Sequence, residues 1–335
     1  MQGLKDSSLL RQQAYVNGQW CAADSGATVD IKNPANSALL GSVPVMGQAE
    51  TRRAIVAAEE AGKAWAARTA GERSRILRAW YDLLLANQED LALILTSEQG
   101  KPLAEARGEI AYAASYIEWF AEEGKRAYGD IIPPNLADRR IVALKQPVGV
   151  CAAITPWNFP TAMIARKAAA ALAAGCTMLV KPAPQTPFSA LALALLGERA
   201  GIPAGVFSII TGDAQAIGGE ICANPVVRKL SFTGSTATGI KLMQQCAPTL
   251  KKLSLELGGN APFIVFDDAD VDAAVAGAMA SKYRNSGQTC VCANRFLIQD
   301  GIYERFASKL AEAVGKLVLG TGTDAGVTQG PLIDS

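Results

Sequence analysis

Across residues 151–246, short apolar runs alternate with segments of helical length, and this alternation constrains the fold more than any other feature. The predicted strands, each of a length typical of buried strands, are 151–155, 177–180, 206–210 and 229–232. The predicted helices are 161–174, 186–200, 214–223 and 235–246. Strands that alternate with helices and short Gly/Pro turns predict an α/β fold with a doubly wound parallel sheet. Such sheets bind ligands at the carboxyl ends of their strands.

Other patterns precede this region. Residues 13–20 hold an Asn-Gly pair between apolar residues, which predicts a β-hairpin. The spacing of apolar residues predicts helices over 50–67, 71–87 and 103–126. Residues 130–150 contain a Pro-Pro turn followed by alternating apolar residues, and this pattern predicts an extended arm or hairpin.

A second α/β unit follows the glycine pair at 258–259. Its predicted strands and helices alternate, in the order 262–266, 271–283, 295–298 and 302–317. The final segment, GVTQGPLIDS, is predicted to be a loop.

The composition restricts the chemistry. The chain contains no histidine, which excludes a Ser-His-Asp triad, a Cys-His pair and an HExxH zinc site. Acid–base steps must therefore use Glu, Asp, Lys, Cys, Tyr or a bound cofactor. The net charge of +1 gives no reason to expect nucleic acid binding. No run of about 18 apolar residues occurs, so no membrane span is expected.

The cysteines indicate a compartment. Their number is seven, and they are scattered, which does not resemble a disulfide framework. The first residues lack the apolar core of a signal peptide. We therefore expect a protein of the reducing cytoplasm.

Two segments could hold a nucleotide. The segment FTGST places Gly234 and Ser235 between a strand and a helix, where helix amides can face an anion; an ordinary capped turn has the same pattern. Lys181 directly follows a buried strand and could bind cofactor hydroxyls or phosphate, or be a solvated lysine. Residues 183–185 supply no carboxylate that would exclude a 2′-phosphate, so a bound dinucleotide is expected to be NADP or NAD, with NADP favoured.

Three side chains could take part in catalysis. Cys290 lies in a polar turn, where a thiolate nucleophile is accessible, and a small buried residue is the alternative. Glu256 ends an apolar strand and is either a general base or a surface glutamate. Asn158, in ITPWNFP, can stabilise an oxyanion or simply belong to a turn. No metal site is expected, because no second close cysteine pair accompanies Cys290 and Cys292.

In this order, the segments ITPWNFP, VKP, FTGST, LELGGN and GQTC resemble the signatures of the aldehyde dehydrogenase superfamily, from about residue 13 to the end of the chain. EQGKPLAEARGEI, SYIEWFAEEGKR and GQTCVCANR are similar to its bacterial branch that oxidises succinate semialdehyde with NAD(P). The glutarate-semialdehyde dehydrogenases are similar enough to stay open.

The resemblance implies roles for the candidate residues. Cys290 would attack the aldehyde and later carry a thioester, while the Asn158 amide and the Cys290 N–H would form the oxyanion hole. Glu256 would activate the water that releases the acid. The positions that match cofactor contacts of the family are Thr155, Trp157, Asn158, Lys181, Pro182, Ala183, Pro184, Gly234, Ser235 and Leu257.

Three further positions match this branch. Arg166 and Arg284 would bind the distal carboxylate of a semialdehyde acid, and charge on a helix surface is the alternative. Cys292 matches a second cysteine that pairs reversibly with the nucleophile.

The resemblance also implies a domain organisation. Residues 1–127 and 149–257 would form the NAD(P)-binding domain, 128–148 an oligomerisation arm, and 258–335 the N-terminal portion of the catalytic domain. The full-length family forms homodimers or homotetramers.

Family members continue well beyond the GPLID segment, so we expect this chain alone to be weakly active or inactive. Two other interpretations remain. One is a CoA-acylating enzyme, in which Glu256 would be redundant as a base. The other is a non-catalytic, nucleotide-binding fragment.

Overall fold

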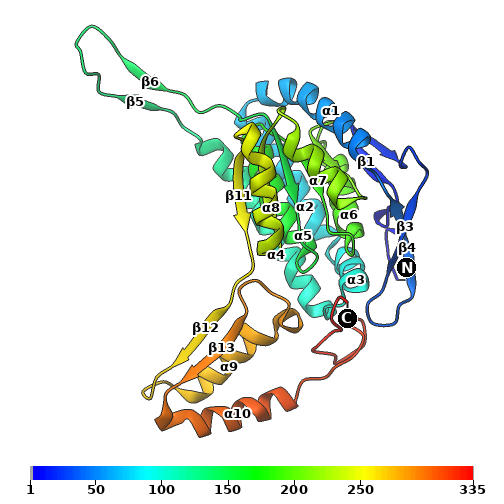
Figure 1. Cartoon of the computed structure of the whole chain (residues 1–335), viewed down its shortest axis with the longest axis vertical. Coiled ribbons are helices and arrows are strands. Elements are labelled where there is room, and N and C mark those ends of the chain that lie inside the picture. Colours follow the sequence, from blue (N-terminus) through cyan, green and yellow to red (C-terminus); the bar gives the residue numbers. More distant parts are fainter. Residues whose placement is uncertain (1–2, 335) are drawn as a thin grey trace.

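The structure is a computed structural model that describes residues 3–334. Its centre is a seven-stranded sheet in the order β11-β10-β7-β8-β9-β1-β2 (Figure 1). The parallel strands are β7 (Val150–Ile154), β8 (Thr177–Lys181), β9 (Phe207–Ile209), β10 (Val227–Thr233) and β11 (Lys252–Glu256). The hairpin of β1 (Ala14–Val16) and β2 (Gln19–Cys21) adds an antiparallel edge. The predicted doubly wound parallel sheet is confirmed.

Helices cover both faces of this sheet. On β7, Cys151 and Ala153 belong to one hydrophobic core, while Val150 and Ala152 belong to the other. The first core involves α2 (Ala70–Ala86), α3 (Gln88–Gln99), α4 (Leu103–Glu123), α5 (Pro160–Ala173) and α6 (Pro187–Arg199). The second involves α1 (Gln48–Ala67), α7 (Ala214–Ala223) and α8 (Thr236–Cys246). Burial on both faces explains why the central strands β7, β8 and β9 are mostly apolar.

The N-terminal hairpin forms at the predicted Asn-Gly pair. Asn17 and Gly18 have φ values of 52° and 73°, the left-handed conformation that a two-residue type I′ turn requires. Three elements were not predicted. They are α3 and the antiparallel pair of β3 (Thr28–Lys32) and β4 (Leu39–Pro44). Helix α3 follows α2 almost directly and is buried over most of its surface, so it lacks an amphipathic pattern.

The second α/β unit has the predicted order. It consists of β12 (Ala261–Val265), α9 (Val271–Tyr283), β13 (Ala293–Ile298) and α10 (Tyr303–Gly315), and its two strands are parallel. Val265, Val275 and Phe306 are in its core. Residues 316–334 hold no regular helix or strand. They return to the turn between α3 and α4, where the Leu103 N–H donates to the Gly322 carbonyl (2.8 Å).

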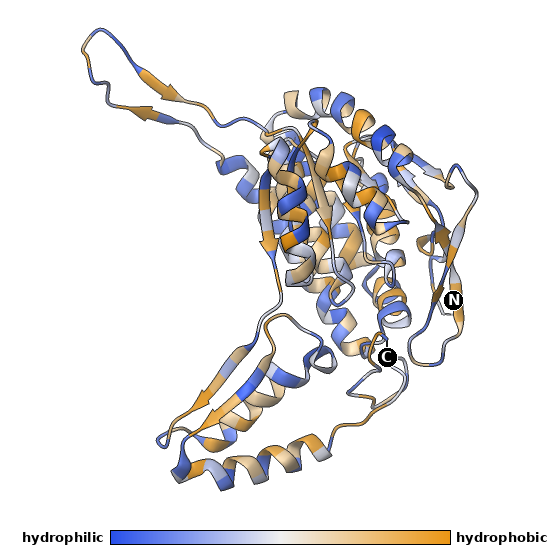
Figure 2. Cartoon of the chain, viewed as in Figure 1, coloured by the Kyte–Doolittle hydropathy of each residue, from blue (hydrophilic) through white to orange (hydrophobic). Residues whose placement is uncertain are grey.

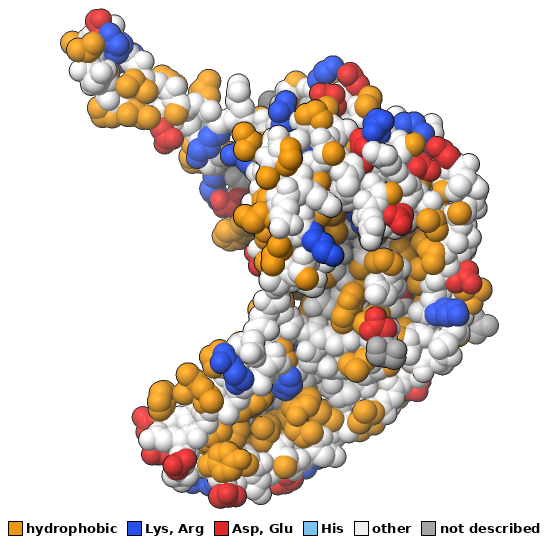
Figure 3. Space-filling view, in the orientation of Figure 1, with side chains coloured by type: hydrophobic (Ala, Val, Ile, Leu, Met, Phe, Trp, Pro, Cys, Tyr) orange, Lys and Arg blue, Asp and Glu red, His pale blue; other side chains and the backbone are white. Residues whose placement is uncertain are grey.

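A two-stranded arm projects from the body, and its strands are among the most hydrophobic segments of the ribbon (Figures 1 and 2). It pairs β5 (Asp130–Ile132) with β6 (Ile141–Ala143). Its apolar side chains face solvent: Ile131 is 84% and Leu144 is 76% exposed. Figure 3 shows further hydrophobic side chains gathered over the β12–β13 unit. Among residues 3–334, no helix has the length and apolar character needed to cross a bilayer.

Candidate active site

A pocket of about 750 Å³ lies between the carboxyl ends of β7, β10 and β11 and the turn before β13. The residues proposed from the sequence that line it are Trp157, Asn158, Arg166, Gly234, Ser235, Leu257, Arg284 and Cys290. Thus segments up to about 130 residues apart converge on one site. The lining also includes Tyr112, Leu332 and Ile333, which the sequence patterns did not single out.

The Cys290 turn packs tightly against the glycines after β11. Cys290 is exposed, and it lies between the short 3-10 helix η4 (Arg284–Gly287) and β13. A Cβ atom on Gly259 would lie 2.5 Å from the Cys290 carbonyl oxygen. Since no side chain tolerates that distance, glycine is required here, and the end of β11 can approach the cysteine turn closely.

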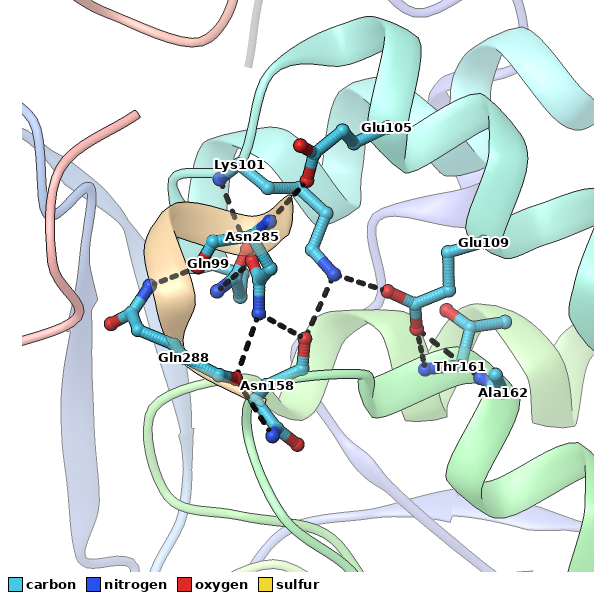
Figure 4. Close-up of polar contacts among 9 residues, drawn as sticks. All are labelled: Gln99, Lys101, Glu105, Glu109, Asn158, Thr161, Ala162, Asn285 and Gln288. Atoms are coloured by element: carbon cyan, nitrogen blue, oxygen red, sulfur yellow. Dashed lines mark hydrogen bonds and ion pairs between the residues drawn. The ribbon is translucent and has the colours of Figure 1, made fainter. Parts of the chain in front are cut away.

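Asn158 is held on two sides (Figure 4). Its side-chain Nδ2 donates to the Gln288 carbonyl at 2.9 Å. Its backbone carbonyl accepts from Lys101 Nζ (2.8 Å) and from Asn285 Nδ2 (3.0 Å). The amide therefore has a fixed place beside the segment that leads to Cys290.

Glu256 occupies a different environment. Its side chain is 58% exposed and lines an adjacent pocket of about 470 Å³. Arg166 lines both pockets, and its Nη2 lies 3.8 Å from Glu256 Oε1. The structure thus brings Glu256 to the edge of the site but does not place it in the pocket that Cys290 lines.

Lys167 is a buried lysine that the sequence reasoning missed. It lines the same adjacent pocket, and its Nζ donates to Thr233 Oγ1 at 2.7 Å. Burial lowers the pKa of Lys167 to about 8. A lysine within an otherwise Ala-rich, buried helix was the signal that could have identified it.

Thr155 and the segment 181–184 lie outside the lining of the Cys290 pocket, at the carboxyl ends of β7 and β8. Lys181 is 3% exposed, and its Nζ donates to the Pro182 carbonyl at 3.0 Å. Burial lowers the pKa of Lys181 to about 8. Within residues 3–334, the buried Thr155 hydroxyl has no hydrogen-bond partner. Both groups therefore have unused capacity for a polar ligand.

The start of α8 offers a further polar surface at the same edge of the sheet. Ser235 caps the helix by accepting from the Thr238 N–H (3.3 Å), and its first turn carries no acidic residue. A helix N-terminus of this kind suits an anion. The donors at β7, β8 and α8 therefore fit a dinucleotide with its hydroxyls and phosphates.

Cys292 differs sharply from Cys290. It is 1% exposed, and its Sγ lies 3.4 Å from the Lys282 carbonyl. Both thiols are free. The predicted reversible pairing of the two cysteines stays a prediction.

Comparison with known proteins identifies the family. Residues 20–335 match the aldehyde dehydrogenase family. The chain is 66% identical over 332 residues to the glutarate-semialdehyde dehydrogenase of Pseudomonas aeruginosa, covering 99% of this chain and 69% of that protein. It is also 66% identical over 331 residues to the NADP(+) succinate-semialdehyde dehydrogenase of Escherichia coli, with the same coverage of both chains.

The fold agrees with these matches. The crystal structure of succinate-semialdehyde dehydrogenase from Burkholderia pseudomallei superposes with a TM-score of 0.99 at 66% identity, covering 99% of this chain and 69% of that one. The chain belongs to the aldehyde dehydrogenase family. Membership implies a small-molecule aldehyde substrate and a nucleotide cofactor.

Proposed function

We propose that this protein oxidises a semialdehyde acid, succinate or glutarate semialdehyde, to the dicarboxylate with NADP+ or NAD+. The observation that carries the proposal is the pocket in which an exposed cysteine, an amide and two arginines meet. The names of the similar bacterial enzymes support the substrate class and NADP.

The residues divide the reaction between them. The Cys290 thiolate attacks the aldehyde carbon, and the Asn158 amide and the Cys290 N–H stabilise the oxyanion that forms. NAD(P)+ supplies the hydride acceptor when bound. Glu256 then takes a proton from the water that hydrolyses the thioester on Cys290, which releases the acid and restores the thiolate. The balance is aldehyde, water and NAD(P)+ on one side, and acid, NAD(P)H and a proton on the other.

The arginines explain the preference for an acidic aldehyde. Arg166 and Arg284 line the pocket beside Cys290, and a guanidinium can pair with a carboxylate through two hydrogen bonds. The Arg284 guanidinium also lies 5.2 Å from the centre of the Phe159 ring, which restricts its position. A substrate carboxylate held there leaves the aldehyde end free to reach Cys290.

The cofactor would be held along the carboxyl edge of the sheet. Thr155, Lys181 and the loop of Pro182, Ala183 and Pro184 would bind one end, and Trp157, Gly234, Ser235 and Leu257 the other. The unused hydrogen-bonding capacity at Thr155 and Lys181 supports this assignment.

Domain roles and assembly follow from the same proposal. Residues 1–127 and 149–257 would bind the cofactor, and 258–335 would belong to the catalytic domain. The exposed apolar arm at 128–148 supports a role in homo-oligomerisation. The seven free cysteines support a cytoplasmic location.

Initial rates of NAD(P)H formation test the function. Succinic and glutaric semialdehyde are each assayed with NAD+ and NADP+, with and without CoA, and butanal serves as the uncharged control. We expect oxidation with NADP+ that is independent of CoA, and none in a Cys290→Ser variant. Arg284→Met should weaken the preference for the semialdehydes over butanal.

The same assay decides between the alternatives. Formation of an acyl-CoA product would contradict the proposal in favour of a CoA-acylating enzyme. Quenching of tryptophan fluorescence by NADPH without oxidation of any aldehyde would favour the non-catalytic interpretation.

A further inference from the structure

A buried polar cluster contacts Asn158 and joins the start of α4 to the cysteine turn (Figure 4). Its centre is an ion pair between Lys101 Nζ and Glu109 Oε2 at 2.6 Å. The side chain of Lys101 is 0% exposed and that of Glu109 is 1% exposed. Removing two charges from water costs free energy that their attraction does not reliably return, so stability alone does not account for this pair.

The Lys101 ammonium contacts three neighbouring groups. It bonds to Glu109, donates to the Asn158 carbonyl (2.8 Å), and lies 4.0 Å from the centre of the Phe159 ring. All three N–H groups of the ammonium can therefore be used. Two of the three contacts are to the turn that carries the oxyanion amide.

Glu109 holds the other end of that turn. Its Oε1 accepts from the backbone N–H groups of Thr161 (2.9 Å) and Ala162 (3.2 Å), at the start of α5. Through the ion pair, Lys101 and Glu109 together hold the chain from the Asn158 carbonyl to the Ala162 N–H.

Asn285 joins this unit to the cysteine turn. It is 0% exposed and has a left-handed φ of 53°. Its Nδ2 donates to the carbonyls of Asn158 (3.0 Å) and Gln288 (3.2 Å). Its Oδ1 accepts from Gln99 Nε2 (3.0 Å) at the end of α3. The Gln288 carbonyl also accepts from the Asn158 amide. Asn285 therefore fixes both the Asn158 turn and the segment that leads to Cys290.

We propose that Lys101, Glu109 and Asn285 are positioning residues that hold the Asn158 amide at the place where the oxyanion forms on the Cys290 adduct. The proposal rests on the proposed function in taking Cys290 as the nucleophile and the Asn158 amide as an oxyanion donor. None of the three side chains lines the Cys290 pocket, so they act through Asn158 and Gln288.

Two reactions of Cys290 separate positioning from general folding. With p-nitrophenyl acetate, the thiolate attacks the ester carbonyl, an oxyanion forms, and p-nitrophenolate leaves as the acyl group passes to sulfur. With iodoacetamide, the thiolate displaces iodide and no oxyanion forms. Neither reaction needs NADP+ or an aldehyde. Cys290→Ser gives the background from the other cysteines.

Asn285→Gly is the main variant. Glycine adopts the left-handed conformation without strain, so the backbone stays while the amide is removed. Displacing Asn158 should slow acylation about tenfold or more, because misplacement by about 1 Å costs up to roughly a hundredfold. Alkylation should stay within about twofold of the parent. Ser286→Gly is the matched control: Ser286 has a φ of 55° and bonds to Gly330 rather than to Asn158, so both rates should stay at the parental level.

Lys101→Met with Glu109→Gln is the second variant. It removes both charges together, so neither is left unpaired, and glutamine retains an acceptor for the start of α5. We expect a parental circular dichroism spectrum, slower acylation and unchanged alkylation.

Three results would overturn the inference. They are parental acylation in Asn285→Gly, an equal fall of acylation and alkylation in a folded variant, or a parent chain that is alkylated at Cys290 but not acylated. If the double variant does not fold, Asn285→Gly decides. Failure of the parent to oxidise any semialdehyde would contradict the proposed function and leave the acylation comparison valid.

Discussion

The two polar groups on either side of the Cys290 turn receive very different support. The Asn158 carbonyl accepts from the buried Lys101 and its amide donates to the half-buried Gln288, whereas Glu256 lies at the end of the outermost strand β11 with its side chain 58% exposed. Its contact to Arg166 is long, at 3.8 Å. A donor that stabilises a developing charge works best when it is fixed in advance. A base that activates water in a later step needs solvent and room to move.

The largest effect is expected for the exposed Glu256. Glu256→Gln removes the proposed base and should slow release of the acyl group from Cys290 by roughly 10²–10⁴-fold, while leaving its formation near the parental rate. With p-nitrophenyl acetate, the variant should give one equivalent of p-nitrophenolate and then a slow phase. A variant without that initial burst would place Glu256 in the first step and remove the contrast between the two sides.

A smaller effect is expected on the fixed side. Asn158→Ala should slow acylation by roughly 10²–10³-fold, the usual cost of removing one oxyanion donor, with little change in alkylation by iodoacetamide. Asn260→Ala, an exposed asparagine between β11 and β12, is the control and should behave as the parent. Equal losses of acylation in both variants would show that the effect is not specific to the Asn158 amide.

The smallest effect concerns Glu98 in α3, the helix that also supplies Gln99 to the cluster. Burial raises the pKa of Glu98 to about 8. Hydrogen bonds from the N–H groups of Phe188 and Ser189 (both 2.8 Å) act in the opposite direction and lower this pKa, but burial has the larger effect. The folded chain therefore retains a proton that the unfolded chain, with an ordinary value of 4.5, releases. The free energy of unfolding should fall as pH rises from 4.5 to about 8.

Urea unfolding at several pH values across that window tests the point. Glu98→Gln stays neutral, so its decline with pH should be shallower than that of the parent. Glu59→Gln, which changes an exposed glutamate, should keep the parental slope. Parallel slopes in the parent and Glu98→Gln would show that Glu98 is ionised in the folded chain.

The fold could be predicted because the signals lie next to each other in sequence. Helix α9 has the bounds that its apolar spacing predicts, and Ser235 caps α8 as its side chain suggests. Helix α3 could not be recognised, because a helix buried over most of its surface has no polar face.

The site also contains residues that could be predicted from the sequence and residues that could not. The order of the motifs identified Cys290 and Asn158, and both line one pocket. The supporting cluster could not be found, because its contacts join residues that are far apart in the sequence. Lys101 and Asn158 are separated by 57 positions, and Gln99 and Asn285 by 186. Nothing in EQGKP or RNSGQ alone indicates that Lys101 and Asn285 share an acceptor.

The side chains that cap the helices around the sheet differ in chemical type. The carboxyl group of an acidic side chain accepts from the first amides of α5, α6 and α7: Glu109, Glu98 and Asp213 respectively. Helix α8 receives only the hydroxyl of Ser235. An acidic cap competes with an incoming anion for the N–H groups and the positive end of a helix. Glu109 and Asp213 thus place acidic side chains at the starts of α5 and α7, and Glu98 occupies the first N–H groups of α6. Among these four helices, α8 has the N-terminus that best suits a phosphate.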